Sequence, residues 1–83
     1  MKLTSLEDRI KSSAIDTSIH ARKDGYASPI VLARLYVAWL KTDMEELLNY
    51  EVVPNRENRI ANLQRYIDYR LQVLAYMEGQ EAA

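Results

Sequence analysis

The sequence predicts an all-α fold in which two long helices form an antiparallel hairpin and a shorter helix precedes them. Apolar residues recur three and four positions apart over three stretches, as on one face of a helix. Glycine and proline fall mainly at the borders of those stretches, and no segment alternates apolar and polar residues as a half-buried strand does. With 83 residues, the chain has room for one domain, residues 1–83.

The first helix is predicted over about residues 4–20. Thr4 and Glu7 have the spacing of a capping box, and Glu7 and Lys11 form a favourable pair four residues apart. Ile15 and Ile19 fall on a different face from the earlier apolar residues, so the pattern leaves the end of this helix open.

The second helix is predicted over about residues 29–51. Ser28 can accept a hydrogen bond as the N-cap, and Pro29 suits the first helical position, where its missing N–H is not needed. Pro54 prevents the helix from continuing into the next one.

The third helix is predicted over about residues 55–78, with Asn55 as its cap and Gly79 as its terminator. Since about four residues join it to the second helix, the two must fold back on each other as a hairpin.

Composition and charge limit the chemistry that the chain can perform. The sequence has no cysteine and one histidine, so thiolate zinc sites are excluded and no cofactor is predicted. A net charge of −1 gives no general attraction to nucleic acid or to an anionic membrane. The N-terminus has charges where a signal peptide needs an apolar run, and no segment is long and apolar enough for a bilayer. We therefore expect a cytoplasmic protein with no membrane partner.

The second helix carries more apolar surface than a hairpin can cover. Its apolar side chains spread well beyond the stripe of about 100° that faces one core. This predicts self-association, most simply as a homodimer that assembles the three-helix units into a larger bundle, with higher oligomers as an extension. The alternative is a monomeric three-helix bundle that the N-terminal helix completes. The predicted interface residues are Leu32, Leu35, Tyr36, Trp39, Tyr66, Tyr69, Val73 and Tyr76.

Arg70 interrupts the apolar seam of the third helix. Folding the hairpin about Val52 and Val53 places Arg70 level with Leu35 or Tyr36, and Trp39 level with Tyr66. The same register gives Arg59 a carboxylate partner, Glu46, but gives Arg70 none.

Three hypotheses account for Arg70, in order of preference. Its stem packs on the seam while the guanidinium stacks on Trp39 or Tyr66. Alternatively, it pairs with a carboxylate from another element, such as Asp16, Asp24 or an acid of a second copy, and so fixes the register. In the third hypothesis it receives an anion, framed by aromatic rings.

A second basic group lies in the connector between the first two helices. His20, Arg22 and Lys23 could form a small anion site, together with Arg70 and Arg59. The alternative is that His20 is an exposed polar residue near a helix end. No nucleophile with a positioned acid accompanies it, so no hydrolytic site is predicted.

The leading functional hypothesis is a small non-enzymatic interaction protein, such as an adaptor, an inhibitor or a regulatory subunit that binds another protein. The runner-up is an oligomer that binds an anionic small molecule, such as a nucleotide, in a groove formed by Arg70, the neighbouring tyrosines and the connector that begins at His20 of an adjacent subunit. DNA binding ranks below both, because the arginines of the third helix are spread over more than one face and interleaved with acids.

Overall fold

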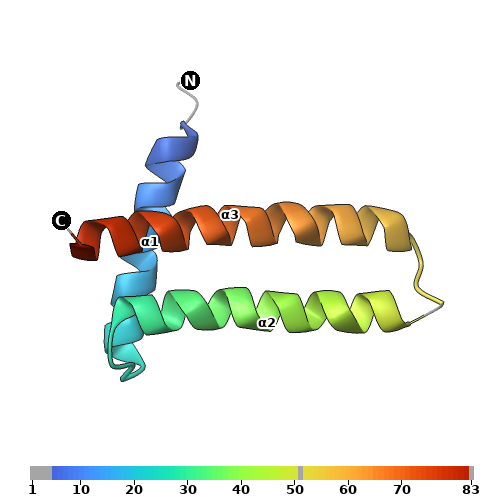
Figure 1. Cartoon of the computed structure of the whole chain (residues 1–83), viewed down its shortest axis with the longest axis horizontal. Coiled ribbons are helices and arrows are strands. Elements are labelled where there is room, and N and C mark those ends of the chain that lie inside the picture. Colours follow the sequence, from blue (N-terminus) through green and yellow to red (C-terminus); the bar gives the residue numbers. More distant parts are fainter. Residues whose placement is uncertain (1–4, 51, 83) are drawn as a thin grey trace.

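The computed structural model describes residues 5–50 and 52–82 and contains three helices. α1 spans Leu6–Lys23, α2 spans Pro29–Asn49 and α3 spans Arg56–Ala82. α2 and α3 lie side by side and run in opposite directions, which confirms the predicted all-α hairpin (Figure 1). Within the described residues, no helix has both the length and the apolar composition needed to span a membrane.

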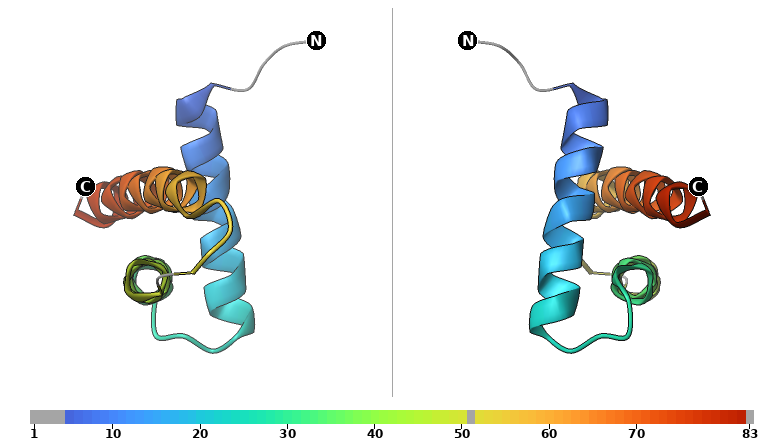
Figure 2. Two further views of the ribbon diagram at one scale, coloured as in Figure 1. Left: turned by 90° about the vertical axis from the view of Figure 1, so that its right-hand side faces the viewer. Right: turned by 90° about the vertical axis from the view of Figure 1, so that its left-hand side faces the viewer.

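α1 crosses the hairpin near its open end instead of lying along it. End-on views place α1 on one side of the α2–α3 pair, where it contacts both helices (Figure 2). The C-terminal part of α2 and the N-terminal part of α3 extend well beyond α1. The axis of α1 is therefore not parallel to the axes of α2 and α3 (Figure 1 and Figure 2).

Local sequence explains where the first two helices begin. The hydroxyl of Ser5 accepts the amide of Asp8 at 3.1 Å, and the hydroxyl of Ser28 accepts the amide of Val31 at 3.3 Å. The predicted cap Thr4 lies outside the described residues, and Ser5 is the N-cap of α1. α1 then continues three residues beyond its predicted end, to Lys23.

Asn55 directly precedes α3, at the position predicted for its cap, whereas the end of α3 differs from the prediction. Asn55 has φ 55°, a left-handed conformation that asparagine tolerates, and its carbonyl accepts the amide of Arg59 at 3.0 Å. Gly79 does not terminate α3, which continues to Ala82. One glycine costs a helix only about 1 kcal/mol relative to alanine, and the Glu and Gln around it are good helix formers. The C-terminal end of α2 was predicted near residue 51 and lies at Asn49.

The core sits where α1 crosses the hairpin. Its central cluster brings together Ala14 of α1, Ile30 and Ala33 of α2, and Val73 and Met77 of α3. The buried residues of α1 are all small and share one face: Ala14, Thr17 and Ala21. Small side chains let the backbone of α1 approach the hairpin closely.

Tyr69 ties α1 to α3 by its ring and its hydroxyl. The phenol donates to the carbonyl of Arg9 at 3.0 Å and is also hydrogen-bonded to the hydroxyl of Ser13. Since the phenol has one proton, Ser13 donates in the second bond. The guanidinium of Arg9 lies 5.5 Å from the centre of the Tyr69 ring.

Replacing Tyr69 with Phe should weaken the docking of α1. The substitution keeps the ring but removes both hydrogen bonds, so we expect the free energy of unfolding to fall by about 1–2 kcal/mol. Chemical denaturation followed by circular dichroism measures this. Tyr76→Phe is the matched control, because the half-buried Tyr76 lies on the same helix and makes no hydrogen bond through its hydroxyl within the described residues. Equal stability of the two variants would contradict the role given to Tyr69.

Enlarging the small face of α1 should also destabilise the fold. Ala21 is 1% exposed, so Ala21→Leu forces the two layers apart, with an expected loss of about 1–3 kcal/mol. Ala38→Leu on the exposed side of α2 should leave the stability within about 0.5 kcal/mol of the parent. If Ala21→Leu left the free energy of unfolding unchanged in the same denaturation experiment, a close approach of α1 to the hairpin would not be required.

Candidate functional site

A pocket of about 440 Å³ lies in the corner where α1 meets the hairpin. We call it the corner pocket. All three helices contribute to it: Ser13, Asp16, Thr17 and His20 come from α1, Tyr36, Trp39 and Leu40 from α2, and Tyr66 and Arg70 from α3. Its position follows from the crosswise packing of α1, which leaves a concave angle against the longer arm of the hairpin.

Arg70 is stacked on an aromatic ring at the α2–α3 seam. Its guanidinium carbon lies 4.5 Å from the centre of the Tyr36 ring, and both side chains are half-buried. The sequence predicts Leu35 or Tyr36 beside Arg70, and the structure places the Tyr36 ring there. The ring partner was predicted to be Trp39 or Tyr66, and that detail is wrong: in this register Tyr36 is the nearest ring.

The arginine makes no ion pair with any described residue. Within the described part of the chain, the ion pairs are Lys11–Glu7 at 3.3 Å and Arg34–Glu78 at 3.2 Å. Asp16 lines the corner pocket with Arg70 but does not approach it closely enough for a salt bridge. The pairing of Arg59 with Glu46 is likewise not formed.

The other aromatic residues of the pocket are well exposed. Trp39 and Tyr66 are each 49% exposed although both line a concave surface. Trp39 also meets Tyr36 edge-on, with ring centres 5.9 Å apart. Rings that are held in place yet half-open to solvent are able to stack against a further group.

The hydroxyls of α1 that face the pocket are already used within the fold. Thr17 is 1% exposed and donates to the carbonyl of Ser13 at 2.7 Å, while Ser13 bonds to Tyr69. His20 and Asp16 are exposed and lie one helical turn apart on the pocket side of α1. The groups free to meet a ligand are therefore Arg70, His20, Asp16 and the aromatic rings.

The structure brings together only part of the predicted anion site. His20 and Arg70 line the corner pocket, whereas Arg22, Lys23 and Arg59 are exposed and lie outside its lining. Arg22 and Lys23 lie in the last turn of α1, and Arg59 lies in the first turns of α3, near the hairpin turn. Sequence reasoning missed Ser13, Thr17 and Leu40, although the spacing of residues 13, 16, 17 and 20 on one helix face was a usable signal.

The predicted interface residues divide into three groups. Trp39 and Tyr66 are exposed. Leu32 and Val73 are 2% and 1% exposed and are therefore buried within the protein's own fold. The remaining predicted residues are half-buried: Leu35, Tyr36, Tyr69 and Tyr76.

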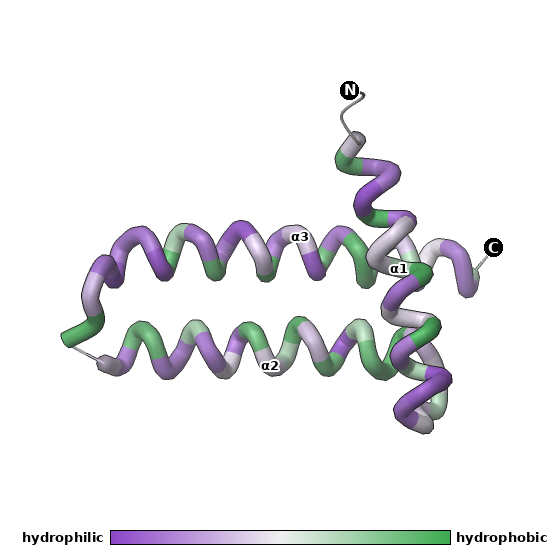
Figure 3. The backbone as a smooth tube through the Cα atoms, turned by 180° about the vertical axis from the view of Figure 1, so that it is seen from behind, coloured by the Kyte–Doolittle hydropathy of each residue, from purple (hydrophilic) through white to green (hydrophobic). Residues whose placement is uncertain are grey.

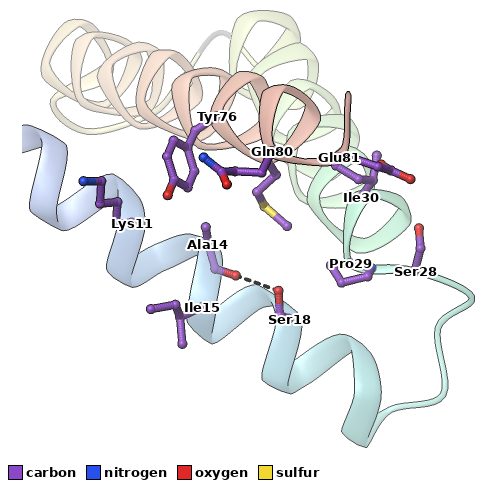
Figure 4. A pocket seen from close by; sticks show the side chains of 11 residues that line it. Lys11, Ala14, Ile15, Ser18, Ser28, Pro29, Ile30, Tyr76, Gln80 and Glu81 are labelled. Carbon is purple, nitrogen blue, oxygen red and sulfur yellow. Dashed lines mark hydrogen bonds between the residues drawn. The ribbon is translucent and has the colours of Figure 1, made fainter. Parts of the chain in front are cut away.

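A second hollow, the apolar groove, lies on the other side of α1 and has a volume of about 400 Å³ (Figure 4). Ala14 and Ser18 of α1 face Tyr76 and Gln80 near the end of α3, Ile15 also lines the groove, and the start of α2 closes one end. Lys11 stands at its rim, where its hydrogen bond with the Glu7 carboxylate raises the pKa of the Lys11 ammonium. The groove has mostly apolar walls and was not predicted.

Comparisons with known proteins assign no relative to this chain: no family model matches it, and no curated protein or solved structure is significantly similar to it. Within the described residues, no three His, Asp or Glu side chains gather as metal ligands.

Replacing Arg70 with Leu should leave the fold intact. The substitution removes a cation–π contact worth about 0.5–1 kcal/mol and breaks no salt bridge. The leucine side chain adds apolar contact on the seam. We expect a free energy of unfolding within about 1 kcal/mol of the parent and an unchanged oligomer size by light scattering. A changed oligomer size would instead favour Arg70 as the group that sets the register of assembly.

Proposed function

We propose that the protein is a small non-enzymatic helical interaction protein, located in the cytoplasm, that self-associates through the half of the hairpin that α1 leaves uncovered. We call this part the open half: residues 38–49 of α2 and residues 56–66 of α3. As an adaptor, an inhibitor or a regulatory subunit, the assembled oligomer would bind another protein.

One observation carries the proposal. No described residue between Ala38 and Tyr66 is buried, whereas the buried core cluster of Ala14, Ile30, Ala33, Val73 and Met77 lies outside that stretch and includes a residue of α1. The open half nevertheless contains regularly spaced apolar side chains, and the apolar character of α2 continues along its whole length (Figure 3). The half-buried ones are Leu40, Met44, Leu47, Ile60 and Leu63.

The overall dimensions agree with a unit that is incomplete alone. The radius of gyration is 14.8 Å, whereas a compact domain of this length has about 12 Å. The accessible surface is 6326 Å², whereas a compact monomer of this mass exposes about 5,100 Å². The surplus of about 1,200 Å² exceeds the roughly 800 Å² that each partner buries in a standard interface.

A second copy of the chain is the occupant that these features favour. Between Ala38 and Tyr66 the sequence has four basic and five acidic side chains, so two open halves carry little net charge and do not repel strongly. Two hairpins that share their apolar sides form four helices around one core, which is the arrangement that covers a two-helix layer most simply.

Charged substitutions in the open half should weaken self-association. We expect Trp39→Glu or Tyr66→Glu to raise the dissociation constant at least about tenfold, because each places an unpaired carboxylate in an apolar contact. Sedimentation velocity over a dilution series measures this. Ile19→Glu is the matched control: Ile19 is 54% exposed, comparable to 49% for Trp39, but lies on α1.

A parent protein that sediments as a 9.6 kDa monomer at all micromolar concentrations would overturn the proposal of self-association. A concentration-dependent dimer that Trp39→Glu and Ile19→Glu weaken equally would move the interface away from the open half.

A further inference from the structure

We propose that the corner pocket binds a nucleoside monophosphate, a ligand that joins an anionic group to a flat ring bearing hydrogen-bond donors. The pocket volume of about 440 Å³ lies within the range of small-molecule sites. Its lining combines one arginine, one histidine, one aspartate and three aromatic rings drawn from three helices. One copy supplies every lining residue, but Trp39, Leu40 and Tyr66 also belong to the open half, so a bound ligand would compete with self-association for these side chains.

Arg70 receives the phosphate. Its guanidinium carbon lies 4.5 Å from the centre of the Tyr36 ring, and this contact holds the positive charge at the pocket before any ligand arrives. Within the described residues it donates to no hydrogen bond and meets no carboxylate within 4.0 Å. A half-buried cation that is held in place but not neutralised is suited to a bidentate contact with a phosphate. His20, which lines the same pocket from α1, supplies a second donor.

Trp39 and Tyr66 receive the base. They stand on different helices at the same level of the hairpin, and each ring is half exposed within the pocket. Aromatic side chains in such positions stack on the face of a nucleobase, with a contribution of about 1–3 kcal/mol per base. Because these rings can stack on a flat group, we expect the anion to carry such a group and not to be a simple ion.

Asp16 selects against a bare anion. Its carboxylate lies in the same pocket and would repel a phosphate that came close to it. The hydroxyls of a ribose or the amino group of a base can instead donate to it. Ser13 and Thr17 donate their hydroxyl protons within the fold, so they offer no donor to a phosphate. The pocket therefore favours a ligand that is anionic at one end and rich in donors elsewhere.

The single tryptophan of the chain reports on this pocket directly. AMP is titrated into the parent protein while Trp39 fluorescence is excited at the red edge of its absorption band, where AMP does not absorb. We expect saturable quenching, with adenosine and inorganic phosphate each binding at least about tenfold more weakly, because each lacks one half of the recognition. Isothermal calorimetry on the same samples gives a readout that does not depend on Trp39.

Arg70→Met and Arg65→Met form the decisive pair of variants. Both remove an arginine from α3, but Arg65 is exposed, donates only weakly to Asn62 at 3.4 Å and lies outside the pocket. We expect AMP affinity to fall at least about tenfold in Arg70→Met and to stay unchanged in Arg65→Met, with similar melting temperatures in both.

Asp16→Asn tests the selection of the ligand. It removes the repulsion of a bare anion, so inorganic phosphate should bind more tightly relative to AMP than it does to the parent. Three results would each overturn the proposal: no saturable binding of AMP, equal affinities for AMP, adenosine and phosphate, or an equal loss of affinity in Arg70→Met and Arg65→Met.

Discussion

The close crossing of α1 over the hairpin is the contact on which the rest of the structure depends. Small residues on α1 admit the approach, and the Tyr69 hydroxyl fixes it by bonding to Ser13 and to the Arg9 carbonyl. The same crossing creates the core, where Val73 is 1% exposed. It also produces the two hollows on either side of α1 and leaves the open half of the hairpin without a third layer.

Periodicity and capping chemistry were sufficient to predict the hairpin. Ser28 followed by Pro29 marked the start of α2 to the residue, and the short turn fixed the antiparallel arrangement and the level of Tyr36 beside Arg70. The end of α3 was misjudged because a glycine is a weak terminator when good helix formers follow it, as they do after Gly79.

The direction of α1 could not be read from the sequence. Its periodicity identified a helix, but a connector of five residues allows α1 to lie along the hairpin or across it, and the choice depends on which tertiary contacts pack best. For the same reason the corner pocket was predicted only in part. Arg70 and His20 are far apart in sequence and become neighbours only because α1 crosses at that level.

Arg56 links the two long helices in a way that makes them interdependent. Its guanidinium donates to the Leu48 carbonyl at 2.9 Å and so places a positive charge at the C-terminal end of α2, whose last turn has no basic residue of its own. At the other end, Arg34 pairs with Glu78. A chain cut at the turn would thus leave α2 with exposed carbonyls as well as a bare apolar side. We therefore expect the two helices of the hairpin to fold as one cooperative unit, because α3 supplies both the cation at the C-terminal end of α2 and the apolar side against which α2 packs.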